Sequence, residues 1–223
     1  IPGHQVVGRV AAIGSHDAQG LLKRSGLRVG DRVGVAWINS ACGSCEFCCS
    51  GRENLCADFK ATGLDTHGGY AQYLSVRGDF AHRLPDALTD VEAAPLLCAG
   101  AIGYRSLSLA NLQDGQTLGL TGFGASAHLV LALARHRYPH SPVVVFARSP
   151  EERAFALELG AVWAGDTRDR PPQPCAAIID TTPAWTPVAE ALKNLQAGGR
   201  LVINAIRKES ADQSVLLELD YPE

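Results

Sequence analysis

Several features are missing from this 223-residue sequence, and each absence excludes a class of protein. No apolar run reaches the roughly 18 residues needed to cross a membrane, so we expect no membrane partner. No lysine- or arginine-rich run is present and the formal net charge is −3, which argues against a nucleic acid partner. No charged leader followed by an apolar stretch opens the chain, so we expect a cytoplasmic protein.

Methionine is absent too, so Ile1 is not an initiator position. The sequence also stops just after an apolar, strand-like stretch, with no helix or capping residue to close it. We therefore expect a chain truncated at both ends; the alternative is a processed mature protein. The residues present are 46% hydrophobic and 19% charged, which is typical of a globular chain long enough to bury a core.

Seven cysteines are present, and five of them lie close together in the first quarter of the chain. Without a secretion signal, clustered cysteines indicate a metal site rather than a disulfide scaffold. The spacing Cys-x2-Cys-x2-Cys-x7-Cys allows four thiolates to surround one zinc ion tetrahedrally, with no position left open. Cys49 is then a spare thiol, although it could replace Cys48. The predicted ligands of this structural zinc are Cys42, Cys45, Cys48 and Cys56.

The pattern of apolar residues changes near residue 100. Before it, short β-type runs at residues 6–10, 32–36 and 70–76 are bounded by turn residues, which predicts a β-rich, barrel-like unit. After it, strands alternate with helices of about ten residues, which predicts parallel βαβ units and a doubly wound α/β sheet. We expect strands at 117–121, 143–146, 176–180 and 199–205, helices at 125–137, 150–159 and 187–196, and a surface loop at 167–174.

A glycine-rich turn joins the first of these strands to the first helix and fits the pattern G-x-G-x-x-G/A. In this context the pattern predicts dinucleotide binding, because the helix N-terminus offers free N–H groups to a pyrophosphate. The first glycine permits the tight turn, the second permits close approach of the phosphates, and the final alanine still allows close helix packing. The predicted cofactor-binding residues here are Gly122, Phe123, Gly124, Ala125, Ser126 and Ala127.

The end of the second strand indicates which nucleotide is bound. Sites for NAD(H) usually present Asp or Glu there to hold the ribose 2′-hydroxyl. This sequence has Ala147, Arg148 and Ser149 instead, and no carboxylate before Glu151. A guanidinium group and a hydroxyl suit a 2′-phosphate, so NADP(H) is favoured over NAD(H). The alternative is that Arg148 is only a solvated surface charge.

His4 and Cys98 are ordinary when each is taken alone, since a lone His or a thiol in an apolar stretch is usually structural. Both complete an ordered set of landmarks, however, through which the chain resembles the medium-chain, zinc-dependent alcohol dehydrogenases. Two further segments, 53–56 and 203–209, resemble the bacterial branch related to cinnamyl-alcohol dehydrogenases. The ordered landmarks are Gly3-His4, Gly30–Val33, the four-cysteine segment, Gly68–Tyr73, the Cys98 segment and the Gly122 turn.

The resemblance implies a fold of two domains and an activity. It implies a partial GroES-like catalytic domain at 1–100 that includes the zinc lobe at 42–56, a Rossmann coenzyme domain at 101–212, and the start of a return to the catalytic domain at 213–223. His4 and Cys98 would be catalytic-zinc ligands, while a further Cys ligand would lie upstream of residue 1. Hydride would pass between NADP(H) or NAD(H) and a primary alcohol or aldehyde, with Ala205 and Ile206 near the nicotinamide. Relatives are usually dimers or tetramers, so a homo-oligomer is implied.

One residue departs from the family pattern, and other functions remain open. The family often has Glu after the zinc-binding His, where this chain has Gln5; the change keeps hydrogen bonding and loses a charge. The first alternative is a non-catalytic zinc- and dinucleotide-binding module on the same scaffold. The second is a zinc-free relative of the quinone reductases, which the four-cysteine segment and the His/Cys pair argue against.

Overall fold

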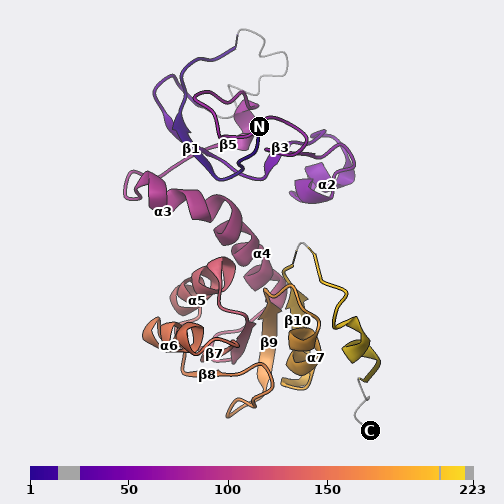
Figure 1. Ribbon diagram of the computed structural model, residues 1–223. Coiled ribbons are helices and arrows are strands. Elements are labelled where there is room, and N and C mark those ends of the chain that lie inside the picture. Colours follow the sequence, from indigo (N-terminus) through magenta and orange to yellow (C-terminus); the bar gives the residue numbers. More distant parts are fainter. Residues whose placement is uncertain (15–25, 206, 219–223) are drawn as a thin grey trace. The chain divides into compact units, whose positions relative to one another are not determined.

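A computed structural model describes residues 1–14, 26–205 and 207–218 of the chain (Figure 1). The chain divides into two compact units, Ile1–Cys98 and Ala99–Glu223, and each is described separately below. Ile206, one of the residues expected near the nicotinamide, lies outside the described residues.

The first unit is built on a small antiparallel sheet of order β1-β2-β5 and a separate pair of short strands. In the sheet, Val6 pairs with Val35, and Val33 pairs with Arg83. Leu97 packs on this sheet at Gly34, where an added Cβ atom would lie 2.7 Å from its methyl group. The strands are β1 (Val6–Arg9), β2 (Arg32–Val35), β3 (Ile38–Ser40), β4 (Lys60–Ala61) and β5 (Ala81–Arg83).

The strand expected at residues 70–76 is not formed, and this prediction was wrong. Its alternation suits a half-buried strand, but a strand also needs a neighbour with which to exchange backbone hydrogen bonds. Residues 71–78 and β1 line the same cavity. Among the described residues no backbone hydrogen bond joins the two segments, and Tyr70 and Tyr73 remain about four-fifths exposed.

Residues 90–110 are helical, a feature that the apolar pattern did not reveal. Helix α3 (Asp90–Pro95) begins at a complete capping box, in which Thr89 accepts from the Glu92 backbone and Glu92 accepts from that of Thr89. Proline has no N–H to donate, and after Pro95 the helix continues as a π-helix at Leu96–Gly100. Helix α4 (Ala101–Ala110) follows and ends at Asn111 in the left-handed conformation.

The second unit has a parallel five-stranded sheet of order β10-β9-β6-β7-β8. The chain proceeds outward from β6 through β7 to β8, then returns to the other side of β6 for β9 and β10. This is the predicted doubly wound, Rossmann-type α/β sheet, and its direction reverses beside β6. The strands are β6 (Leu118–Thr121), β7 (Val143–Phe146), β8 (Trp163–Gly165), β9 (Cys175–Asp180) and β10 (Leu195–Ile203).

Helices cover both faces of this sheet. Alternate strand residues such as Leu120, Val145 and Ile179 join one core cluster with α4, α5 (Ala125–Arg137) and α6 (Pro150–Glu158). The intervening residues Val144 and Ile178 join a second cluster, which includes Ala191 of α7 (Thr186–Leu192). The period of two along each strand therefore divides the apolar residues between two buried faces.

The last helix and strand differ from their expected bounds. The helix expected at 187–196 ends at Leu192, and the strand expected at 199–205 already begins at Leu195. The strand is irregular where Gly198 adopts a positive φ of 73°, and its regular pairing with β9 resumes at Arg200. The expected strand began at Gly199, whereas the strand in the structure includes this irregularity and starts before it.

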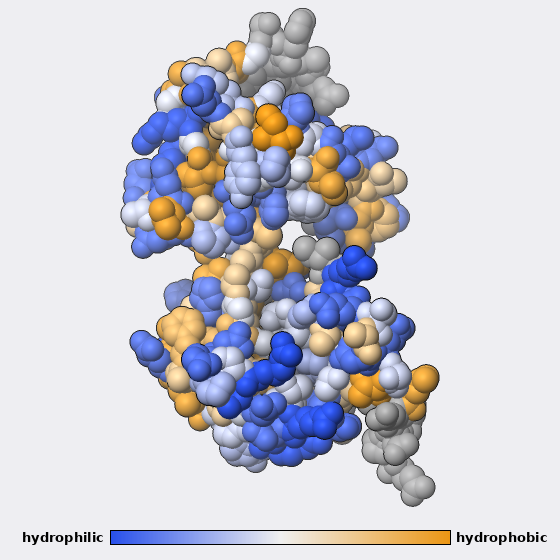
Figure 2. Space-filling model, viewed as in Figure 1, coloured by the Kyte–Doolittle hydropathy of each residue, from blue (hydrophilic) through white to orange (hydrophobic). Residues whose placement is uncertain are grey.

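Among the described residues of the two units, no helix is both long and apolar enough to cross a membrane. In space-filling view, hydrophobic and hydrophilic residues are interspersed over the visible face of each unit (Figure 2).

Candidate functional site

The four predicted zinc-binding cysteines lie together in the first unit. The Sγ atoms of Cys42, Cys45, Cys48 and Cys56 are all within 4.8 Å of one another. The sulfurs of Cys42 and Cys48 are 3.8 Å apart. Zinc–sulfur bonds of about 2.3 Å in a tetrahedron separate the sulfurs by about 3.8 Å. This set therefore fits a zinc ion with four thiolate ligands.

Local backbone structure arranges this cluster. The short helix α2 (Glu46–Cys49) carries Cys48, and Gly43 turns the chain with a φ of 77°. Backbone N–H groups of Ser44 and Cys45 donate to the Cys42 sulfur and lower its pKa to about 6, whereas desolvation raises the pKa of Cys48 to about 12. Of the two thiols, Cys42 therefore loses its proton more readily, and a bound zinc ion would favour the thiolate form of both.

Cys49 lies outside the cluster. Its thiol donates to the backbone carbonyl of Ser44 at 3.5 Å. All seven cysteines fall within the described residues, and all seven are free thiols. The structure therefore places Cys48 with the other three sulfurs and leaves Cys49 as the spare residue.

A second pair of candidate ligands is formed by His4 and Cys98, which are 94 residues apart in the sequence. The Nε2 atom of His4 is 3.2 Å from the Cys98 sulfur, and both residues are half-buried. Zinc bound tetrahedrally to one imidazole and one thiolate would hold these atoms about 3.6 Å apart. The two side chains therefore fit as a partial zinc site and supply two of its ligands.

Close backbone packing holds His4 in place. The backbone N–H of Gly69 donates to the Gly3 carbonyl at 2.9 Å, and that of Tyr70 donates to Pro2 at 3.1 Å. A Cβ atom at Gly68 would lie 2.2 Å from the Gly3 carbonyl oxygen. The glycines at 68 and 69 are therefore needed for the approach of two distant segments. An edge-on contact with Trp37, 4.9 Å between ring centroids, fixes the imidazole from another side.

Cys98 lies in the π-helix that follows Pro95. Such turns often occur at functional sites, because the extra residue in the turn changes the direction of a side chain. Burial raises the pKa of the Cys98 thiol, and a hydrogen bond from the Gln5 side chain opposes this effect. Gln5, the departure from the family pattern, therefore contacts one of the two candidate ligands directly.

The predicted dinucleotide turn has the geometry that anion binding requires. Gly122 has a φ of 75°, and a Cβ atom there would lie 2.9 Å from the Thr182 side chain, so only glycine fits. Gly124 begins helix α5 without a side-chain cap, and a Cβ atom there would face open space. The first N–H groups of α5 are therefore available to a ligand beside an open space, which fits a pyrophosphate.

This turn forms one wall of a cavity of about 660 Å³ at the carboxyl ends of β6, β7 and β9. In an open parallel sheet, this edge beside the reversal of strand order is the expected ligand site. The predicted residues that line the cavity are Gly122, Phe123, Gly124, Ala125, Ser126 and Arg148. Residues missed from the sequence include Arg168, the 181–184 segment, Glu209 and Asp212.

Other predicted cofactor residues lie outside the cavity lining. Ala127 is buried in the core beneath the turn, as close helix packing requires. Ser149 caps α6, where its hydroxyl accepts from the Glu152 backbone and donates to the Glu151 carboxylate. Ala205 follows β10 and does not line the cavity.

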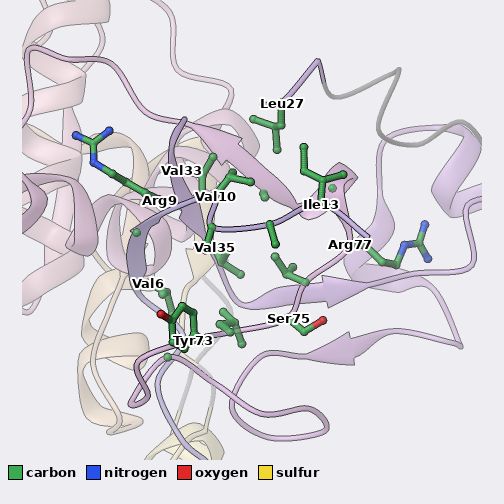
Figure 3. Close-up of a pocket in the computed structure, with 18 of the residues that line it drawn as sticks. Val6, Arg9, Val10, Ile13, Leu27, Val33, Val35, Tyr73, Ser75 and Arg77 are labelled. Carbon is green, nitrogen blue, oxygen red and sulfur yellow. The ribbon is translucent and has the colours of Figure 1, made fainter. Parts of the chain in front are cut away.

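A larger cavity of about 820 Å³ lies in the first unit (Figure 3). Apolar side chains from β1 and β2, including Val6, Val33 and Val35, face this space together with residues 71–78. The charged groups around it are paired elsewhere, since Arg9 donates to the Gly30 carbonyl and Arg77 to Asp79. None of the predicted ligands or cofactor residues lines this cavity.

Comparison with known proteins identifies the family. Residues 1–86 match the alcohol dehydrogenase GroES-like domain. The chain is 47% identical to the probable alcohol dehydrogenase AdhA of Mycobacterium tuberculosis over 92% of its own length and 58% of the relative's. An alcohol dehydrogenase of Geobacillus stearothermophilus is 38% identical over 72% of this chain and 45% of the relative. The chain thus spans about half the length of these relatives.

Solved structures agree on the fold. The protein CAD of Helicobacter pylori, complexed with NADP(H), has a TM-score of 0.80 at 25% identity, covering 93% of this chain and 60% of that one. A cinnamyl alcohol dehydrogenase of Sorghum bicolor has a TM-score of 0.77 at 29% identity, covering 98% and 64%. With its GroES-like segment, four-thiol cluster and Rossmann-type sheet, the chain belongs to the zinc-dependent, medium-chain alcohol dehydrogenases.

Proposed function

We propose that this chain contributes the nucleotide site and part of the catalytic zinc site of an oxidoreductase that interconverts primary alcohols and aldehydes with NADP(H). The observation that carries the proposal is the 3.2 Å contact between His4 and Cys98. These residues have different sequence surroundings and no shared structural task, yet a zinc ion would need both at this separation. The four-thiol cluster has no open ligand position and would stabilise its own lobe.

The chain's residues have distinct tasks in this proposal. A bound zinc would act as a Lewis acid on the substrate oxygen, and a bound nicotinamide would exchange hydride with the carbon that carries it. His4 and Cys98 would hold the metal, with Gln5 hydrogen-bonded to the thiol. The glycine turn and the N-terminus of α5 would bind the pyrophosphate. Gly124 matters because its missing side chain leaves the phosphates room to approach.

The preference for NADP(H) rests on the charges around the cavity. Arg148 and Arg168 both line it, and neither guanidinium group has a hydrogen-bonding or ionic partner among the described residues. The carboxylates in the lining nearby are Asp166, which is 3.5 Å from Arg153, and Glu152. Two unpaired guanidinium groups at the ends of adjacent strands suit a 2′-phosphate. Among structural relatives, one is complexed with NADP(H) and another with NADH, so the family alone leaves both open.

The activity is tested in the complete native polypeptide, with primary alcohols and aldehydes of different length and nicotinamide absorbance as the signal. His4→Ala and Cys98→Ser should each reduce kcat/KM by at least about a hundredfold, because a zinc ligand is lost. Zinc content should fall by one ion per chain in these variants. Cys49→Ser is the matched control and should keep both zinc and activity, since Cys49 lies outside the cluster. Full activity in His4→Ala would contradict the proposal.

Coenzyme preference is tested by titrating NADP⁺ and NAD⁺ into the same protein. Arg148→Ala should weaken NADP⁺ binding by about tenfold or more and change NAD⁺ binding little. The substitution removes a charged hydrogen bond to the 2′-phosphate, which only NADP⁺ carries. Equal loss for both nucleotides would mean that Arg148 does not contact the 2′-phosphate.

A non-catalytic module remains the second candidate, because the same scaffold can bind zinc and nucleotide without turnover. It would be favoured if the native protein bound two zinc ions and the coenzyme but oxidised none of the alcohols tested. We also propose a homo-oligomer, which sedimentation of the native protein would test.

A further inference from the structure

Lys208 lies in the segment after β10 and forms a buried ion pair that the proposed chemistry does not use. Its Nζ atom contacts the carboxylate of Asp180, and these side chains are only 8% and 0% exposed. The same ammonium group donates to the backbone carbonyls of Thr182 and Ala184, both at 2.8 Å. All three of its hydrogens are therefore used: one by Asp180 at the end of β9, and two by the segment that follows β9.

Asp180 extends this contact to the dinucleotide turn. Its Oδ1 atom accepts from the Thr121 hydroxyl at 2.6 Å and from the Thr182 hydroxyl at 2.8 Å. Thr121 directly precedes Gly122, and Gly122 packs against the Thr182 side chain. One buried carboxylate thus joins the ends of β6 and β9, and Lys208 adds the segment after β10.

A second carboxylate repeats the arrangement four residues further on. Asp212 accepts from the backbone N–H groups of Trp185 and Thr186 and from the Thr186 hydroxyl. These contacts lower the pKa of Asp212 to about 2, so it is ionised at neutral pH. The backbone N–H of Glu209 also donates to the Pro183 carbonyl at 2.8 Å. The 208–212 segment is therefore fastened along the whole of residues 180–186.

Residues on both sides of this connection line the nucleotide cavity. Thr181, Thr182, Pro183, Ala184 and Thr186 come from one segment, and Glu209 and Asp212 come from the other. Lys208 itself is not part of the lining. We infer that Lys208 is a positioning residue, which sets this wall of the cavity at the distance from the Gly122 turn that the coenzyme requires.

This inference rests on coenzyme binding at the proposed site. It predicts that substitution of Lys208 changes the affinity for the coenzyme separately from the thermal stability of the protein. In Lys208→Met the two carbonyl bonds and the ion pair are lost, so coenzyme dissociation constants should rise by about tenfold or more. The KM for the coenzyme should rise likewise, whereas kcat at saturation should change little because Lys208 touches no reacting atom. NADP⁺ and NAD⁺ should be affected alike, since this wall is not the one that carries Arg148.

Loss of one partner from a buried ion pair also destabilises a fold, so a second variant separates the two effects. In Asp180→Asn/Lys208→Met both charges are removed, while the amide oxygen can still accept from Thr121 and Thr182. Thermal stability should therefore recover, but affinity should remain reduced because no group holds the 182 and 184 carbonyls. A stable double variant with wild-type affinity would overturn the inference.

Lys193→Met is the matched control, because Lys193 pairs with Glu190 at 2.9 Å in the same unit and neither residue lines the cavity. It should leave the coenzyme dissociation constant within about twofold. An equal loss of affinity in Lys193→Met and Lys208→Met would overturn the inference, since general destabilisation would explain both. Failure of the wild-type protein to bind any dinucleotide would instead contradict the proposed function.

Discussion

The two units of this chain are stabilised by different means. Both clusters of buried apolar residues found in the described chain lie in the α/β unit, between Leu107 and Val202. The first unit has scattered buried side chains such as Val35 and Leu97, and a cavity of about 820 Å³. It depends on a thiol cluster and on glycines that permit backbone contact. The comparison indicates that the α/β unit is organised by its core, and the first unit by its thiol cluster and by close backbone contacts.

The largest test of this contrast is loss of a ligand from the thiol cluster. Cys45→Ser should abolish zinc binding at that cluster, and structural zinc contributes about 10–16 kcal/mol of binding free energy in small zinc domains. Backbone amides at 42–56 should then exchange rapidly with solvent, while the α/β unit keeps its own unfolding transition. Zinc analysis with hydrogen exchange measures both, and Cys49→Ser is the control. Unchanged exchange protection in Cys45→Ser would remove the distinction between the units.

Two valines, one in each unit, allow side-chain packing in the two units to be compared. Val145 is fully buried in the core of the α/β unit, whereas Val35 is 4% exposed and borders the cavity. Val145→Ala should cost about 2–3 kcal/mol of unfolding free energy, and Val35→Ala about 1 kcal/mol. The second cost is smaller because a side chain beside a cavity makes fewer packing contacts that the substitution would remove. Denaturant unfolding measures each change. Equal costs would mean that both units are packed alike.

Two glycines, one in each unit, allow the constraint on the backbone to be compared. Gly122 has a positive φ and its Cβ position is 2.9 Å from Thr182, whereas Gly8 in β1 has open space around it. Gly122→Ala should therefore cost about 2 kcal/mol and weaken coenzyme binding. Gly8→Ala should change stability by less than about 0.5 kcal/mol. Calorimetry of the two variants is the measurement, and a tolerated Gly122→Ala would show that the turn can relax.

The smallest expected effect is the pH dependence that Asp212 contributes. Its pKa is lowered from 3.8 to about 2 in the folded chain by the N–H groups of Trp185 and Thr186. Because the folded value is the lower one, the stabilisation is present above about pH 4 and is lost as the pH falls through 2. Asp212→Asn should lower stability at neutral pH by about 1 kcal/mol and match the wild type below pH 2. A constant difference at all pH values would contradict this assignment.

Much of the fold could be predicted from local sequence. The strands and helices of the α/β unit alternate with clear periods, so β6, α5, β7 and α6 lie within one residue of their expected bounds. The errors occurred where a partner decides the structure. Residues 70–76 have a strand-like pattern but no neighbour, and the helix expected at 187–196 ends at Leu192 because the chain already pairs with β9 from Leu195.

The sequence by itself determined the elements whose causes are close in the chain: the four cysteines within 15 positions, the glycine turn and the periodic strands. Only the tertiary structure decided which distant groups meet. His4 reaches Cys98 across 94 positions, and Lys208 reaches Asp180 across 28. Arg168 joins Arg148 around one cavity because β7 and β8 are neighbours in the sheet. Such contacts follow from the path of the backbone through space, and a short sequence pattern contains no record of that path.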